Sequence, residues 1–401
     1  MQFLSPAIRA ASAFTMGGAG FAVANLLLAR HLSPHDYGHL SLVLAITLVS
    51  VPLGPLSLDA MVLRNRPGPM TRLLALSSIT GVIGGILVAL FASIVYSVEP
   101  GFLPVMAIAI AMGSITRVGA SVYQSEKRYT WSLWLIQSSN LTLLLAASTT
   151  IFLVSVSPKA VFAAFGVHWV LAAIICWLSL KLMSGFSVSE TWEASWKERL
   201  PLFGYLVTSQ LTAQMDRLVI PKFLDIESLA TFGVLAALVL APFKMLELGT
   251  GYTLIPGLRT AATHEARREI LNHETKIASV VVILAIVSGF IVAPWAADML
   301  LRGKYELGLT LVGAAVVAGV LRICVVFVSS IITALGSQSH LEALNYRSWF
   351  ALFISVAGGW YGSQWGLPGV ILGLAGGSLA RLGFATVIAR RVWQIPEKGV
   401  S

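Results

Sequence analysis

Seven charged residues lie inside apolar runs that are long enough to cross a membrane. They are five bases and two acids: Arg117, Arg217, Lys244, Arg322, Arg381, Asp216 and Glu247. A charge at mid-membrane costs at least about 2.5–3.5 kcal/mol, so such residues face a wet cavity, pair with one another or bind a ligand. A guanidinium group donates two parallel hydrogen bonds to phosphate oxygens. The basic excess therefore predicts a cationic cavity suited to a pyrophosphate.

A polar row includes Arg217. Gln210 and Gln214 precede it by seven and three residues, so the three side chains share one face of a helix, whereas Asp216 points to another face. Two amides and a guanidinium on one helix face indicate the lining of a cavity. The alternative is that they hydrogen-bond to neighbouring helices.

Two further polar pairs leave alternatives open. Lys244 and Glu247, three residues apart, either neutralise each other or contribute a free base to the cavity. Gln137 and Asn140 are additional candidates for its lining. Arg322 has no acid nearby in the sequence.

The composition determines the class of protein. Apolar residues make up 57% of the 401-residue chain and charged residues 11%, against roughly 25% charged in a soluble domain. The mean hydropathy is +0.83. These values predict a polytopic membrane protein. Cys176 and Cys324 both fall in apolar runs, so no disulfide framework is expected.

A membrane-spanning helix needs about 20 apolar residues, and on this rule the sequence predicts an all-α integral membrane fold of twelve helices. Their expected ranges are residues 10–29, 37–58, 73–97, 102–122, 131–156, 160–183, 201–223, 229–256, 277–297, 307–335, 344–363 and 367–390. The loops on the side of the termini, with the termini themselves, carry 17 bases, whereas the opposite side carries five: Arg30, Lys159, Lys222, Arg302 and Lys304. This asymmetry predicts cytoplasmic N- and C-termini. It also accounts for most of the net charge of +9, so nucleic-acid binding is not expected.

A tight polar turn separates the first two helices. Ser33 is the expected N-cap, Pro34 occupies the first helical position and Asp36 completes a capping box. A weaker copy of this hairpin lies 192 residues on, where Lys222 replaces Arg30 and Asp225 replaces Ser33. The copy predicts two six-helix lobes, residues 1–183 and 201–401, related by a parallel pseudo-twofold repeat.

The predicted connection between the lobes is residues 184–200. Trp192, Trp196 and Leu200 recur every four residues, and Glu193 and Lys197 form an i,i+4 pair. The pattern indicates an amphipathic helix in the cytoplasmic interface, with an unstructured linker as the alternative.

Two motifs carry a resemblance to a known family. The segment from Leu27 to Gly38 reads Leu-Leu-Ala-Arg-x-Leu-x-Pro-x-Asp-Tyr-Gly, and Gln214–Val219 reads Gln-Met-Asp-Arg-Leu-Val. Both resemble Wzx-type flippases of the multidrug/oligosaccharidyl-lipid/polysaccharide (MOP) superfamily. The resemblance implies a MATE-like fold in the bacterial inner membrane and alternating access. It further implies export of an undecaprenyl-pyrophosphate-linked oligosaccharide, with a polysaccharide polymerase and export machinery as partners and no cofactor or enzymatic activity.

Other functions fit the sequence less well. A drug or cation antiporter of the same superfamily is the main alternative, but it would need buried carboxylates, and the first helix has none. A membrane glycosyltransferase or polymerase would need paired acids in the outer loops, and the sequence places no such pair there. Gly303-Lys304 lacks the glycines of a nucleotide-binding loop. His31, His35 and His39 have helical spacing, but Pro34 should interrupt that helix, so a metal site is not expected.

Overall fold

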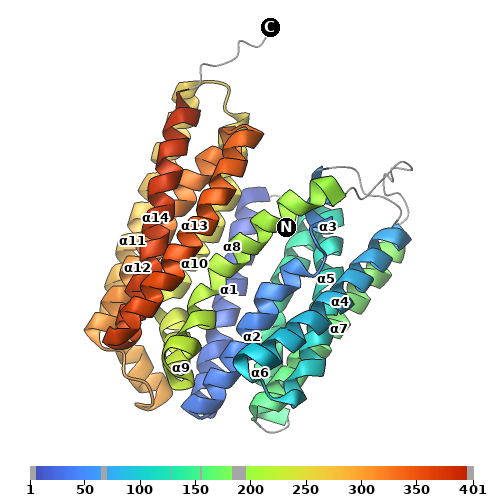
Figure 1. The fold of residues 1–401 in the computed structure, drawn as a ribbon, viewed down its shortest axis with the longest axis vertical. Helices are drawn as coiled ribbons and strands as arrows, with labels where there is room; N and C mark the ends of the chain where they lie inside the picture. The colour runs from blue at the N-terminus through green and yellow to red at the C-terminus, as the bar shows by residue number, and fades with distance from the viewer. Residues whose placement is uncertain (1–5, 65–69, 127, 154–155, 183–195, 395–401) are drawn as a thin grey trace. The chain divides into compact units, whose positions relative to one another are not determined.

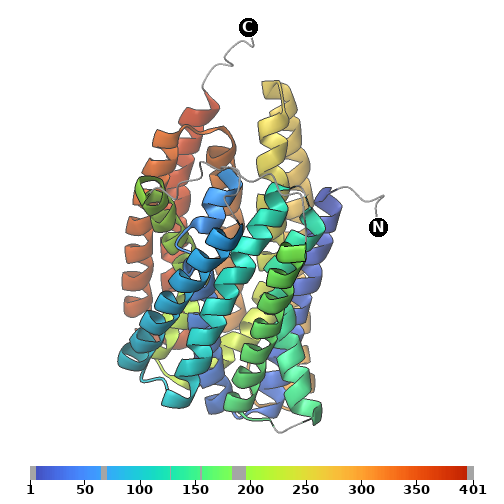
Figure 2. The same ribbon diagram turned by 90° about the vertical axis from the view of Figure 1, so that its right-hand side faces the viewer.

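The computed structural model describes residues 6–64, 70–126, 128–153, 156–182 and 196–394. These residues form helices and turns without a β-strand, which confirms the predicted all-α fold (Figures 1 and 2). Nine helical stretches among them are long and apolar enough to cross a membrane, and one, Gln338–Trp393, contains two helices. Helix α8 (Trp196–Phe223) is not among the nine, because polar residues such as Arg217 lower its hydropathy.

The chain divides into two compact units, Met1–Leu218 and Val219–Ser401. The first contains α1 (Pro6–His31), α2 (Pro34–Leu53), α3 (Leu58–Arg64), α4 (Met70–Tyr96), η1 (Pro100–Phe102), α5 (Leu103–Ser125), α6 (Tyr129–Leu153), α7 (Pro158–Leu182) and most of α8. The second contains α9 (Ile226–Leu235), η2 (Ala236–Leu240), α10 (Ala241–Thr260), α11 (His264–Leu301), α12 (Leu309–Leu335), α13 (Gln338–Gly362), η3 (Ser363–Trp365) and α14 (Gly366–Trp393). Most of the predicted 184–200 helix lies outside the described residues, so this helix and the lobe boundary stay predictions.

Helix α5 is the centre of the first unit. It packs against α2, α3, α4, α6 and α7. A Cβ added at Gly81 of α4 would meet the Ser114 side chain and the Ala111 backbone of α5, so a larger residue would force these helices apart. The core of this region includes Leu58, Val118 and Cys176, which join α3, α5 and α7.

Helices α13 and α14 form the closest pair of the second unit. Backbone contacts join Gly358 to Gly373 and Gly362 to Gly369 without room for a Cβ atom. Gly366 begins α14 with φ 66° and ψ −156°, a conformation that is essentially restricted to glycine. Helix α14 also packs against α12, which in turn packs against α10.

The predicted helix over residues 37–58 is wrong at its end. Helix α2 stops at Leu53, and a turn leads into the separate helix α3, which the sequence analysis did not anticipate. Pro55 has no N–H to continue the helix. The next two residues, Leu56 and Ser57, adopt the left-handed region with φ of 49° and 63°.

The predicted helix over residues 229–256 contains a π-helical segment, η2, between α9 and α10. Pro242 follows this segment. Its ring would clash with the carbonyl of Leu238 in a regular α-helix, and the wider π turn relieves that clash.

Two helices begin earlier than predicted because polar first turns extend them. Helix α11 starts at His264, with Thr263 as its N-cap, and its 38 residues span about 57 Å. Helix α13 starts at Gln338, where Ser337 and His340 form a capping box. Spans chosen by hydropathy omit such turns.

Candidate functional site

Arg217 is buried in the first unit, between α8 and α1. Its side chain is 6% exposed, and its guanidinium carbon lies 5.3 Å from the ring centre of Phe21. The aromatic face attracts the cation and fixes its position. Nη1 is buried without a hydrogen-bond partner among the described residues. Arg217 therefore retains donor capacity for a ligand or a water molecule.

A hydrogen-bonded chain joins Tyr37 of α2 to the backbone of α1 at Phe21. The Tyr37 hydroxyl donates to Asn25 Oδ1 at 2.9 Å, and Asn25 Nδ2 donates to the Phe21 carbonyl at 2.8 Å. Tyr37 is fully buried. The first helical hairpin thus positions the ring on which Arg217 rests.

The structure confirms the predicted caps. Ser33 Oγ accepts from the Asp36 N–H at 3.1 Å, and Pro34 follows at the first helical position. The capping box predicted for Asp36 is not the observed arrangement, because its carboxylate accepts from the Ser33 hydroxyl at 2.8 Å instead of from the Ser33 N–H. Asp225 caps α9 by accepting from the Ser228 N–H at 2.6 Å. The two turns therefore begin their second helices in the same way.

The rest of the polar row on α8 is less enclosed than Arg217. Gln210 and Gln214 are half-buried, and Asp216 is buried despite its different helix face. The Tyr96 hydroxyl of α4 donates to the Leu218 carbonyl at 3.0 Å. This bond joins α4 to α8 at the residue after Arg217. The first helical hairpin and α4 thus both position this guanidinium.

Three predicted site residues belong to the second unit. Lys244 on α10 is exposed, whereas Arg322 on α12 and Arg381 on α14 are half-buried. Further along the same helices, Ile332 and Ile388 share a core cluster. Helices α12 and α14 pack against each other, so Arg322 and Arg381 lie on neighbouring helices of the second unit.

Comparisons with solved structures identify the fold. A multidrug resistance MATE family transporter of the MOP superfamily, in its inward-facing conformation, is 15% identical and matches with a TM-score of 0.64 over 96% of this chain and 98% of that one. The outward-facing conformation of such a transporter matches at 14% identity and a TM-score of 0.62 over 96% and 95%. This chain has the MATE fold. No protein-family model and no curated protein matches the sequence, so the likeness establishes the MATE fold and no substrate.

Within this MATE fold, Arg117 faces an acid that the sequence analysis missed. Asp59, in the first turn of α3, interacts electrostatically with Arg117 of α5. Asp59 lies one residue beyond the predicted helix 37–58 and was therefore not counted among the membrane charges. The Pro-Leu-Gly-Pro run at residues 52–55 could have indicated that the chain turns back into the bundle there.

The predicted amide pair lies between α6 and α1. Asn140 Nδ2 donates to Gln137 Oε1 at 2.7 Å. A Cβ added at Gly17 of α1 would collide with the Gln137 amide. The two amides therefore bond to each other within α6, and Gln137 packs against Gly17 of α1.

Pro34 does not interrupt the spacing of all three histidines, as the sequence had suggested. His35 and His39 both lie on α2, with ring centres 4.6 Å apart, so Pro34 separates only His31 from them. In the part of the chain that the structure describes, no group of three or more histidine, cysteine or acidic side chains is arranged to hold a metal ion.

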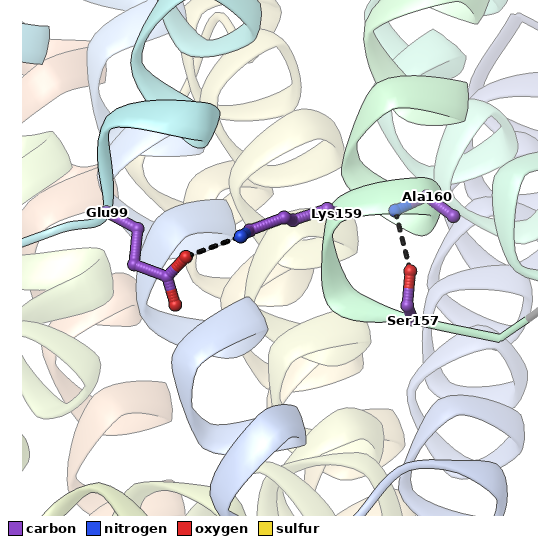
Figure 3. Close-up of polar contacts among 4 residues, drawn as sticks. All are labelled: Glu99, Ser157, Lys159 and Ala160. Carbon is purple, nitrogen blue, oxygen red and sulfur yellow. Dashed lines mark hydrogen bonds and ion pairs between the residues drawn. The ribbon is translucent and has the colours of Figure 1, made fainter.

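An ion pair in the first unit joins Glu99, which precedes η1, to Lys159 in the first turn of α7. Glu99 Oε2 lies 2.7 Å from Lys159 Nζ, and both side chains are about 60% exposed (Figure 3). Next to it, Ser157 Oγ accepts from the Ala160 N–H at 3.2 Å and caps α7. Hydrogen bonding and charge attraction from Lys159 lower the pKa of Glu99.

Proposed function

We propose that this chain is a flippase that exports a polyprenyl-pyrophosphate-linked oligosaccharide across the bacterial inner membrane. The observation that supports this most directly is the buried guanidinium of Arg217, which rests on Phe21 and keeps Nη1 available. A pyrophosphate is the natural partner of such a donor. The polyprenyl tail would stay in the lipid while the head group crosses the membrane.

The bases of the second unit extend the argument. Arg322 and Arg381 lie on the packed helices α12 and α14, and two bases suit a ligand with several anionic oxygens. Rocking of one six-helix lobe against the other would give access from each side in turn. A polysaccharide polymerase would then receive the exported glycan.

A drug or cation antiporter is the second candidate. The matching structures are described as multidrug resistance transporters. Asp216 is 6% exposed, and a buried carboxylate can serve a cationic ligand. A cationic drug and an anionic lipid-linked sugar would depend on Arg217 in opposite ways, so one variant separates the two functions.

The test uses proteoliposomes that contain a fluorescent lipid-linked sugar. We expect Arg217→Ala to slow flipping at least about 10-fold, because a buried charged hydrogen bond contributes about 1.5–3 kcal/mol. Arg30→Ala is the matched control, because Arg30 is exposed at the end of α1. Unchanged flipping by Arg217→Ala at equal incorporation, or faster efflux of a cationic dye, would contradict the proposal.

Arg322→Ala extends the test to the second unit. We expect it to slow flipping in the same assay, without loss of folded protein, because it removes a base from α12. Normal flipping by this variant would restrict the substrate-binding site to the first unit, and it would refute the proposal that bases of both units contribute to binding.

A further inference from the structure

Unpartnered polar atoms gather where α3 meets α4 and α5 in the first unit. Four of them are fully enclosed and have no hydrogen-bond partner among the described residues: Ser57 Oγ, Asp59 Oδ1, Ser77 Oγ and Arg117 Nε. Buried polar atoms are nearly always satisfied, and a group that is not points to water, an ion or a catalytic role.

The glycine contacts show that these atoms converge. Gly54, just after α2, and Gly81 of α4 both press on Ser114 of α5. Ser57 follows Gly54 by three residues, Ser77 precedes Gly81 by one turn, and Arg117 follows Ser114 by one turn. All three steps lead toward the same end of the unit, because α4 runs antiparallel to α2 and α5. Ser77 and Arg117 therefore lie about one helical turn beyond the same crossing point. Leu58, which lies between Ser57 and Asp59, shares a core cluster with Leu74 of α4 and Val118 of α5.

The backbone at this place is strained. Leu56 and Ser57 both have positive φ, an unfavourable conformation for residues other than glycine that persists where the surroundings impose it. This turn carries Asp59 into the bundle, opposite Arg117. Strain of this kind concentrates at binding sites and switches.

We propose that Asp59 is a proton-binding carboxyl in an internal polar pocket formed with Ser57, Ser77 and Arg117. In the ionised state its carboxylate compensates Arg117. A proton taken from water converts the carboxylate to a neutral acid, which can donate to a serine hydroxyl, and leaves Arg117 uncompensated. A metal cation suits the pocket less well, because the fixed charge of Arg117 repels it.

The surrounding elements add few other titratable groups. Helix α5 contributes Arg117 and Tyr123, α7 contributes Cys176, and Arg72 of α4 is exposed. The Tyr123 hydroxyl donates to Ser179 at 2.8 Å. Of these groups, Arg117 is the one that interacts electrostatically with Asp59.

A consequence for transport rests on the proposed function. An uncompensated Arg117 adds one positive charge to the first unit, and this would strengthen the attraction for an anionic head group. Proton binding at Asp59 would thus set the charge with which the carrier meets its substrate. The binding site itself requires no substrate and is tested without one.

The experiment records infrared difference spectra of the purified full-length protein in lipid at stepped pH. We expect a protonated-carboxyl band to appear on acidification, to be lost in Asp59→Asn and to remain in Asp216→Asn. Asp59→Glu keeps a carboxyl and should keep a band, and it controls for misfolding in Asp59→Asn. Arg117→Gln should move the midpoint of the band to higher pH by about 1–3 units.

Three outcomes would overturn the proposal. The first is an acid-dependent band that survives in Asp59→Asn, and the second is a midpoint that Arg117→Gln leaves unchanged. The third is a response to sodium at constant pH in place of the response to acid, which would assign the pocket to a metal cation. None of them depends on lipid-linked sugar, so failure here is distinct from failure of the flippase proposal.

Discussion

The Tyr37 hydroxyl donates a 2.9 Å hydrogen bond to the side-chain oxygen of Asn25, and this bond joins α2 to α1 inside the first unit. Asn25 in turn donates to the carbonyl of Phe21, whose ring lies under Arg217. Tyr37 also interacts electrostatically with Arg217, so the buried bond joins the two helices that supply its neighbours Phe21 and Tyr37.

Tyr37→Phe should destabilise the protein and weaken export together. The substitution leaves the Asn25 oxygen buried without its donor, which costs about 1–3 kcal/mol. The measurement is thermal unfolding in detergent, with flipping recorded in parallel. Tyr346→Phe is the control, because Tyr346 is 76% exposed on α13. Equal melting temperatures for the two variants would show that the buried bond contributes nothing.

Gly373→Ala should destabilise the second unit by about 1–3 kcal/mol, the usual range for overpacking. Its new Cβ would collide with the backbone carbonyl of Gly358, which cannot move aside like a side chain. Gly376 lies three residues further along α14, and a Cβ added there would meet nothing within 4 Å. Gly376→Ala should therefore be neutral or stabilising. Comparing unfolding of the two variants isolates the clash from the general effect of adding a methyl group.

The ion pair between Glu99 and Lys159 should make stability depend on acidity. Because the pKa of Glu99 is lower in the folded state than in the unfolded state, the ion pair stabilises the folded protein at pH values above the ordinary pKa of a glutamate. This stabilisation disappears as the pH falls through the lowered pKa. As the pH is lowered from 7 to 3, the melting temperature of Glu99→Gln should therefore fall less than that of the parent protein. Glu306→Gln, at an exposed loop position, should keep the parental profile.

Local rules predicted much of this fold. Apolar runs located the helices, and side-chain chemistry located the caps at Ser33 and Asp225, because both signals are contained in a few neighbouring residues. The polar row on α8 also emerged from spacing alone. Its partner Phe21 did not, since nothing in the sequence relates position 21 to position 217.

The errors arose where tertiary packing overrides a local pattern. Asp59 fell one residue outside the predicted helix 37–58 and was not counted among the membrane charges, yet the turn after Pro55 directs it toward Arg117. The π turn at residues 236–240 depends on fitting Pro242 into a continuous helix. The relative placement of Arg322 and Arg381 depends on how α12 packs on α14, which no single helix encodes.

The orientation in the membrane is predicted by the distribution of bases. Cysteines introduced at Glu265 and Lys304, both exposed, should react with a membrane-impermeant thiol reagent from opposite sides. We expect Glu265→Cys to be protected in intact cells and Lys304→Cys to be labelled. Permeabilised cells provide the control, since both positions should then react. Labelling of Glu265→Cys in intact cells would reverse the topology.

The membrane potential should bias export even without a coupling ion. An inside-negative potential drives an anion outward with about 2.3 kcal/mol per charge per 100 mV, so a pyrophosphate with two charges gains about 4.6 kcal/mol if its full charge crosses the field. The carrier offers five bases against three acids once Asp59 is counted with Asp216 and Glu247. The loaded carrier would therefore be closer to neutral than the empty one, whose net positive charge is drawn back toward the cytoplasm as it resets.

Proteoliposomes with a potassium diffusion potential of either sign measure this effect at matched pH and sodium. We expect the initial flipping rate to rise when the side equivalent to the cytoplasm is negative and to fall when the sign is reversed. Arg217→Lys keeps the charge but loses the forked donor geometry, so it should lower the rate and retain the voltage dependence. Arg217→Gln removes the charge and should change the voltage dependence as well. Rates that ignore the sign of the potential would mean that substrate charge and cavity charge cross the membrane in balance, and that another gradient drives export.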